Sequence, residues 1–274
     1  MNYRKLFFPI GGGEELKERL YGAFLIANKF NTKLDVLKCM HETNSNIYKS
    51  YSIPKNIISE IDKIIETEYK DKNEEFSILF EKIIKESKID SSLVNLKIVK
   101  GLRSTLVEEE SKFCDLVIAA APPSGLTTAT FETSVLKSGK AVLMFPRIMK
   151  TFSMNNIIIG WNNSIEASRA ITSSIEILKQ SQRVHIVSSS EYIKNPQMMQ
   201  NLVDYLLEHE INVSYEIVKT TRIPGQALLN AALDGNFDLI VAGAYGHKGL
   251  KELMFGGATR YLLENSPIPV FMSH

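Results

Sequence analysis

The sequence predicts an α/β fold of two tandem doubly wound domains, each with a mainly parallel five-stranded sheet flanked by helices. Three observations lead to this prediction. Short apolar runs alternate with longer segments of helical periodicity, the runs lack in–out alternation, and the whole pattern occurs twice. Unbroken apolar runs are typical of strands buried on both faces of a parallel sheet, and strand–helix alternation implies βαβ crossovers.

The individual elements follow in chain order. Each half is expected to run strand, helix, strand, helix, strand, helix, strand, helix, strand. Isoleucines at helical spacing over 57–65 and apolar residues at the same spacing over 76–84 predict helical stretches. The apolar runs that indicate strands are Leu6–Phe8, Leu34–Leu37, Leu116–Ala119, Ala141–Phe145, Ile157–Gly160, Val184–Val187, Leu239–Ala242 and Pro269–Met272.

The internal repeat is visible when the sequences of the two halves are aligned. Asp115–Ala119 matches Asp238–Ala242, and Ser138–Met144 is similar to Ser266–Met272. Leu6–Gly11 likewise aligns with Ile157–Asn162. The boundary is predicted near Lys150–Ser153, which divides the chain into residues 1–150 and 151–274.

Composition excludes several classes of protein. The 274 residues carry a formal net charge of +1, which gives no electrostatic basis for binding duplex nucleic acid or an anionic membrane. Cys39 and Cys114 are too few for a disulfide framework and suit a reducing compartment. No apolar run has the length of a signal-peptide core or a membrane span, so a cytoplasmic location is expected.

A glycine-rich loop follows the predicted strand at 239–242. Gly243 and Gly246 lie three apart, and Gly256 and Gly257 come immediately before a helix predicted from Ala258 to Glu264. Glycine permits close backbone approach, and the amides at a helix N-terminus attract phosphate. The pattern favours a phosphate-binding loop; the alternative is that these glycines serve only turns and a helix cap.

The spacing Gly243-x2-Gly246-x9-Gly256 resembles the glycine motif of ATP-binding universal stress proteins. The family places Ser or Thr directly after the last glycine, where this chain has Gly257, and Thr259 matches a usual Ser or Thr two positions later. Ile223-Pro224 and the segment 265–270 also resemble the family. The resemblance is strong over 155–274 and weak over 1–150. It implies binding of ATP or another adenine nucleotide, ADP or AMP, with Mg²⁺ as a possible companion.

Further site residues are implied by this resemblance. Asn162 stands where the family usually has an Asp near adenine and ribose, and Ser189 matches the adenine-facing end of the second strand. The amides of Gly257 and Ala258 would face the phosphates. His247 lies inside the loop, where it either contacts a phosphate or is solvated. Trp161 either lines the adenine pocket or packs in the core or a lid.

The first half departs from this motif. Its equivalent loop, 120–130, lacks the glycine spacing, and Pro122 and Pro123 remove two amide donors. Gly11-Gly12-Gly13 forms either an anion-binding nest or a flexible turn. Gly101–Ser104 resembles Arg222–Gly225, which favours a structural turn. We therefore expect a degenerate, mainly structural half.

The leading functional hypothesis is a nucleotide-binding regulatory protein of the stress response. The alternative is an interaction protein that binds no nucleotide and acts through its paired domains. No acid, base or nucleophile converges on the loop, so catalysis beyond slow ATP hydrolysis is not expected. The resemblance implies pairing of the halves through their final strands, 141–145 and 269–272, and leaves dimerisation of whole chains open.

Overall fold

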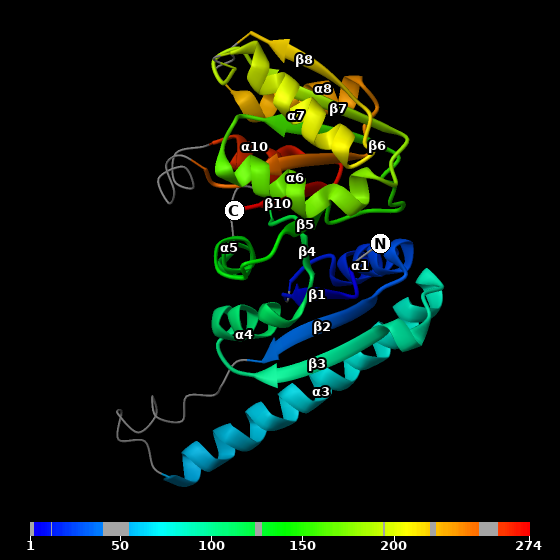
Figure 1. Ribbon diagram of the computed structural model, residues 1–274. Coiled ribbons are helices and arrows are strands. Elements are labelled where there is room, and N and C mark those ends of the chain that lie inside the picture. The colour runs from blue at the N-terminus through cyan, green and yellow to red at the C-terminus, as the bar shows by residue number, and fades with distance from the viewer. Residues whose placement is uncertain are drawn as a thin grey trace.

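The computed structural model describes residues 3–11, 13–40, 55–123, 128–193, 195–219, 223–246 and 257–274. Within them each half follows the predicted order of nine alternating strands and helices (Figure 1). The first half runs β1 (Lys5–Ile10), α1 (Leu16–Phe30), β2 (Lys33–Met40), α3 (Lys55–Ser87), β3 (Val94–Lys100), α4 (Arg103–Glu110), β4 (Leu116–Ala120), α5 (Ala129–Leu136) and β5 (Val142–Phe145). Two 3₁₀ turns, Ser91–Leu93 and Ser111–Phe113, lie before β3 and β4.

The second half repeats the order. It runs β6 (Asn156–Trp161), α6 (Ile165–Leu178), β7 (Arg183–Ser189), α7 (Pro196–Glu208), β8 (Val213–Val218), α8 (Pro224–Asp234), β9 (Leu239–Gly243), α10 (Ala258–Asn265) and β10 (Val270–Ser273). The α/β fold predicted from the alternation of apolar runs is confirmed.

The ten strands of the described ranges belong to one sheet, in the order β3-β2-β1-β4-β5-β10-β9-β6-β7-β8. Every neighbouring pair is parallel except β5 and β10, which pair antiparallel with Leu143 opposite Phe271. The order is unchanged when the two halves are exchanged, as a pseudo-twofold arrangement requires. The final strands therefore join the halves within one chain, as expected, and each covers an edge that would otherwise be unpaired.

Helices cover both faces of the sheet. One core cluster contains buried side chains of α1, α3, α6 and α7, and the other contains those of α4, α5, α8 and α10. Neighbouring strand residues alternate between the clusters: Phe8 packs in the first and Phe7 in the second. Since both faces are buried, the strands read as continuous apolar runs, which explains the pattern in the sequence.

The two halves also repeat their local hydrogen bonds. Asp115 Oδ2 accepts from the backbone N–H groups of Arg4 and Lys5 at 2.7 and 2.9 Å. Asp238 Oδ2 accepts from the N–H groups of Asn155 and Asn156 at 3.0 and 2.9 Å. Each aspartate ties the start of its half's first strand to the start of its fourth. This contact explains why both aspartates appear in the sequence repeat.

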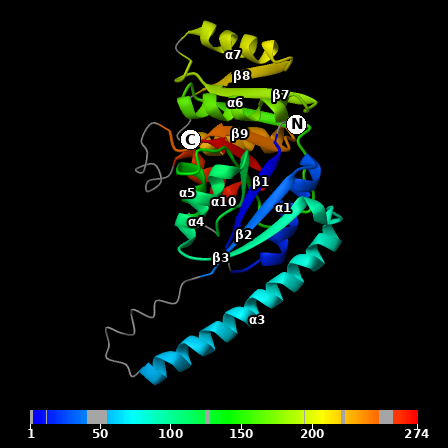
Figure 2. The same cartoon turned by 60° about the horizontal axis from the view of Figure 1, so that its bottom comes forward.

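The long helix α3 breaks the symmetry. Its 33 residues run along the β3 edge, and Figure 2 shows its N-terminal part extending beyond the sheet. Phe76 and Phe80 pack in the core, whereas Ile64 is 66% exposed. No helix in the described ranges combines the length and apolar composition needed to cross a bilayer.

Candidate functional site

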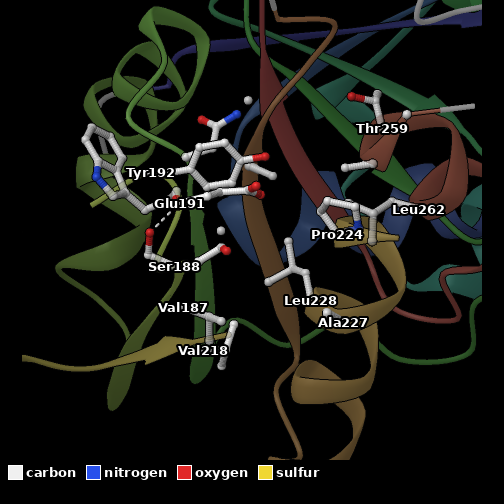
Figure 3. A pocket seen from close by; sticks show the side chains of 18 residues that line it. Val187, Ser188, Glu191, Tyr192, Val218, Pro224, Ala227, Leu228, Thr259 and Leu262 are labelled. Carbon is white, nitrogen blue, oxygen red and sulfur yellow. Dashed lines mark hydrogen bonds between the residues drawn. The ribbon is translucent and has the colours of Figure 1, made fainter. Parts of the chain in front are cut away.

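A pocket of about 220 Å³ lies at the carboxyl ends of β6, β7 and β9, between the strands and helices α8 and α10 (Figure 3). This is the crevice in which open α/β sheets bind ligands. The pocket brings together seven of the predicted site residues: Trp161, Asn162, Ser189, Gly243, Gly257, Ala258 and Thr259. Gly246 is not among the lining residues. His247 and Gly256 lie outside the described residues.

One wall of the pocket is apolar. Figure 3 shows Val187 and Val218 on the strand side and Pro224, Ala227 and Leu228 on the α8 side. The side chain of Leu228 packs over Gly160 of β6, where an added Cβ would lie 2.5 Å from Leu228 Cδ2. Gly160 therefore lets α8 approach the sheet, and the result is an apolar slot suited to a flat ring.

The opposite end of the pocket is the N-terminus of α10. Its N-cap residue is Gly257, which has no side chain to accept from the first amides of the helix. Such uncapped N–H groups favour an anion. The position of α10 depends on Gly225, because a Cβ there would lie 2.6 Å from the carbonyl oxygen of Ala258 and 2.9 Å from its Cα. Gly225 thus permits the starts of α8 and α10 to meet at the pocket.

Thr259 links α10 to the glycine loop. Its side chain is buried, and Oγ1 accepts a hydrogen bond from the backbone N–H of Tyr245 at 3.2 Å. Tyr245 has a φ of 55°, in the left-handed region. The Thr259 hydroxyl therefore holds the first turn of the loop and keeps its own proton available for donation.

Gly243 and Gly246 face the start of α6. A Cβ on Gly243 would lie 2.6 Å from the backbone nitrogen of Ala167, and one on Gly246 would lie 2.8 Å from Glu166 Oε2. The space beside both glycines is therefore filled by protein. Their first role is close packing of the loop against α6, with Gly243 also lining the pocket.

Asn162 and Trp161 lie at the end of β6. Asn162 Oδ1 accepts from the N–H of Ser164 at 3.2 Å, which leaves its amide N–H groups available for a ligand. Ser188 Oγ donates to the carbonyl oxygen of Trp161 at 2.7 Å, the dashed line in Figure 3. Trp161 packs against the core as well as lining the pocket, and its Nε1 is buried without a partner among the described residues. Its packing against the core agrees with the second interpretation, and whether the pocket that it lines takes adenine stays a prediction.

Several residues at the site were not predicted from the sequence, among them the pair Glu191 and Tyr192 after β7, Leu228 on α8, and Glu166 beside Gly246. Glu191 and Tyr192 follow Ser189 in a turn, so their proximity to a strand end was available as a signal. Glu166 and Leu228 lie inside helical patterns, where nothing in the sequence distinguishes them from packing residues. Within the described ranges, no group of three or more His, Cys, Asp or Glu residues is placed to hold a metal ion.

Comparisons with known proteins agree with this geometry. The model of the universal stress protein family matches residues 154–274. A universal stress protein from Archaeoglobus fulgidus is 18% identical, with a TM-score of 0.72, covering 97% of this chain and 94% of its own. A protein of unknown function from Pseudomonas aeruginosa is 15% identical, with a TM-score of 0.57, covering 98% of this chain and 92% of its own. At these identities the likeness concerns the fold.

A further solved structure is that of a universal stress protein in complex with cAMP. It covers 44% of this chain and 96% of its own length, at 19% identity and a TM-score of 0.38, and the cyclic nucleotide is a ligand of that protein. Among curated protein sequences, none matches this chain. Residues 154–274 thus belong to the universal stress protein family, and the whole chain has the tandem fold of its two-domain members.

Proposed function

We propose that the protein is a nucleotide-binding regulatory protein of the stress response, and that it binds one adenine nucleotide in the pocket of its C-terminal half. The observation that carries this proposal is the junction of an apolar slot with an uncapped helix N-terminus in one pocket. An adenine ring fits an apolar slot, and a phosphate group binds the free amides of a helix N-terminus.

The nucleotide would lie with its base between Leu228 and the ends of β7 and β8. Its phosphates would then meet the amides of Gly257 and Ala258, with the Thr259 hydroxyl beside them. Asn162 and Ser189 line the region between the two ends, where a ribose would offer hydroxyl groups. Binding would favour one conformation or assembly of the chain, because a ligand stabilises the state that it binds.

Glu166 bears on whether a metal ion accompanies the nucleotide. Its carboxylate lies beside Gly246 in the turn after β9, so it would repel an unaccompanied phosphate that bound next to this turn. Mg²⁺ is commonly held by one or two carboxylates together with substrate phosphates, so Glu166 fits a metal-bound nucleotide. In that case Glu166 would hold the ion, which would supply charge neutralisation. The same repulsion favours the alternative, an interaction protein that binds no nucleotide.

Calorimetry of the full chain with ATP, ADP and AMP, with and without Mg²⁺, tests the proposal. We expect one site per chain and tighter ATP binding when Mg²⁺ is present. Ala227→Phe projects a ring into the pocket from α8 and should weaken binding about tenfold or more, equivalent to about 1.4 kcal/mol.

The matched control is Asn230→Phe, which places the same ring on the exposed face of the same helix and should leave affinity unchanged. The absence of heat with all three nucleotides in both conditions would reject the nucleotide-binding function and favour the interaction protein.

A further inference from the structure

A second pocket, of about 260 Å³, occupies the corresponding place in the N-terminal half. It lies at the carboxyl ends of β1 and β4 and next to the start of α5. Three arginines line it: Arg19 of α1, Arg103 at the start of α4, and Arg147, two residues after β5. The C-terminal pocket has no arginine among its described lining residues.

The guanidinium groups of Arg103 and Arg19 approach one point, the α-carbon of Gly11. A Cβ on Gly11 would lie 3.2 Å from Arg103 Nη1 and 3.9 Å from Arg19 Nη1. Arg147 forms an ion pair with Glu15 and donates from Nη2 to the carbonyl oxygen of Glu14 at 2.9 Å. All three cations therefore converge on one end of the pocket.

The positive charge of this cluster is only partly compensated. Arg19 is 6% exposed and donates to the backbone carbonyl oxygens of Gly13 and Glu15. Burial lowers the pKa of Arg19, and the positive charges of Arg147 and Arg103 lower it further, against the opposing effect of Glu15 and Glu18. The fold therefore holds like charges together at a cost, which a bound anion would relieve.

Arg103 has the largest unused hydrogen-bonding capacity of the three arginines. Its Nε is buried and has no hydrogen-bond partner among the described residues. It lies beside the thiol of Cys39 and forms none of the ion pairs seen in the described part of the chain. A guanidinium group has five N–H donors in a planar fork that matches an oxyanion.

We propose that this N-terminal pocket binds a phosphate group through Arg19, Arg103 and Arg147. The ligand class is inorganic phosphate or diphosphate, or the phosphate end of a small metabolite.

The architecture around the pocket favours side-chain recognition over the amide recognition of the other half. Pro122 and Pro123 line the pocket and have no N–H to donate. The helix α5 is already capped, because Thr128 Oγ1 accepts from the N–H of Phe131 at 3.2 Å. Guanidinium groups are thus the strong donors that remain. A phosphate group, with several acceptor oxygens and up to two charges, matches three of them better than a single carboxylate does.

The test uses inorganic pyrophosphate as the probe and calorimetry of the full chain at low salt. Wild type should bind pyrophosphate. Arg103→Gln should weaken that site about tenfold or more, since the positive charge and the charge-assisted hydrogen bonds donated by the guanidinium group are lost. Arg103→Lys should give an intermediate affinity because it keeps the charge and loses the fork. Arg4→Gln, which removes an exposed arginine, is the matched control and should change nothing. If the C-terminal pocket also takes pyrophosphate, wild type shows two sites and Arg103→Gln weakens one of them.

Thermal unfolding separates a binding role from a structural one. Without anion, Arg103→Gln should unfold at the wild-type temperature or above it, because a repelling charge has been removed. With pyrophosphate, wild type should gain stability that the variant does not. The proposal is overturned if wild type does not bind pyrophosphate, if Arg103→Gln binds it equally, or if the variant is merely less stable with unchanged affinity.

The ligand is either free phosphate or diphosphate or the phosphate end of a metabolite. These two sources are distinguished in a protein that carries Ala227→Phe, where the added ring fills the C-terminal pocket. Equal affinity of the N-terminal site for ADP and pyrophosphate means that the phosphate groups alone are recognised. Tighter ADP binding means that the nucleoside adds contacts, and in both cases Arg103→Gln must weaken the site. These measurements are independent of whether the C-terminal pocket binds a nucleotide.

Discussion

The helix after the third strand begins differently in the two halves: α8 of the C-terminal half begins with Pro224, and α4 of the N-terminal half begins with Arg103. Each of these residues lines the pocket of its own half. The helix after the fourth strand has Gly257 as its N-cap in one half and Thr128 in the other. These two differences contribute to the contrast between an apolar slot with open amides and a cationic pocket with a capped helix, and Arg19 and Arg147 add to the charge of the latter.

This difference shows how a duplicated fold can keep its backbone while the residues that line its pockets change. The strand order and the aspartate contacts are the same in both halves, because they stabilise the sheet. The residues at the strand ends vary, because they contact solvent or ligand rather than the core. The N-terminal half is degenerate in its glycine motif, yet its pocket has a chemistry of its own.

The largest expected effect comes from Gly225→Val. A Cβ at this position collides with the backbone of Ala258, so the two helix starts must separate, and we expect nucleotide binding to be lost and stability to fall by about 3 kcal/mol. The corresponding residue of the N-terminal half is Ser104, and Ser104→Val should cost less than about 1 kcal/mol. Denaturant unfolding and calorimetry measure both, and equal losses in the two variants would contradict the difference between the halves.

Separating the halves should have the next largest effect. A fragment of residues 151–274 exposes the edge of β10 that β5 covers in the full chain, including Val270 and Phe271. An apolar unpaired edge promotes pairing with another copy, so the fragment should self-associate at micromolar concentration. Light scattering measures the mass of the fragment. A stable monomer would show that the antiparallel pairing of β5 with β10 contributes little to holding the halves together.

A third comparison concerns polar groups at equivalent strand positions. Asp35 lies opposite Phe7 of β1 and accepts from Asn95 Nδ2 at 3.0 Å, with Lys5 Nζ at 2.9 Å. The equivalent residue, opposite Ile158 of β6, is His185, whose Nδ1 lies 2.8 Å from Ser214 Oγ.

Burial acts to raise the pKa of Asp35, but the hydrogen bonds from Lys5 and Asn95 and the charges of Lys5 and Lys97 outweigh it, so the net pKa is lowered. The ionised group therefore stabilises the fold above its unfolded pKa, about 3.9, and this contribution is lost as the pH falls through the lower folded value. Asp35→Asn should cost about 1 kcal/mol at neutral pH and flatten the acid limb of stability. Denaturant unfolding from pH 2 to 7 measures this, and an acid limb unchanged in Asp35→Asn would contradict the expectation.

The smallest effect is expected at the helix caps. Thr128→Ala removes the hydroxyl that accepts from Phe131 and should cost about 1 kcal/mol, a typical value for an N-cap. Gly257→Ala removes no cap and has a φ of −99°, which alanine adopts freely, so stability should change by a few tenths of a kcal/mol at most. Chemical denaturation of both variants measures their free energies of unfolding. Equal losses of stability in Thr128→Ala and Gly257→Ala would contradict the comparison.

Several features were predictable because they depend on local pattern. The apolar runs indicated the strands, since strands buried on both faces must be apolar along their whole length. The repeat of Asp115 and Asp238 indicated two equivalent halves, and the structure shows that both make the same backbone contact. Of the residues that the glycine motif singled out, Gly243, Gly257 and Thr259 line the pocket, and their role toward a ligand stays a prediction.

Other features depend on which segments meet in space. The packing of Gly246 against Glu166 brings the turn after β9 against α6, 80 positions apart in sequence, and no local pattern encodes such a contact. The convergence of Arg19, Arg103 and Arg147 is of the same kind, because each arginine by itself has an ordinary sequence context. By itself the sequence determined the α/β class, the duplication and the position of the loop, since these follow from periodicity and spacing. Only the tertiary structure decided which charges share a pocket, because that depends on distances between elements far apart in the chain.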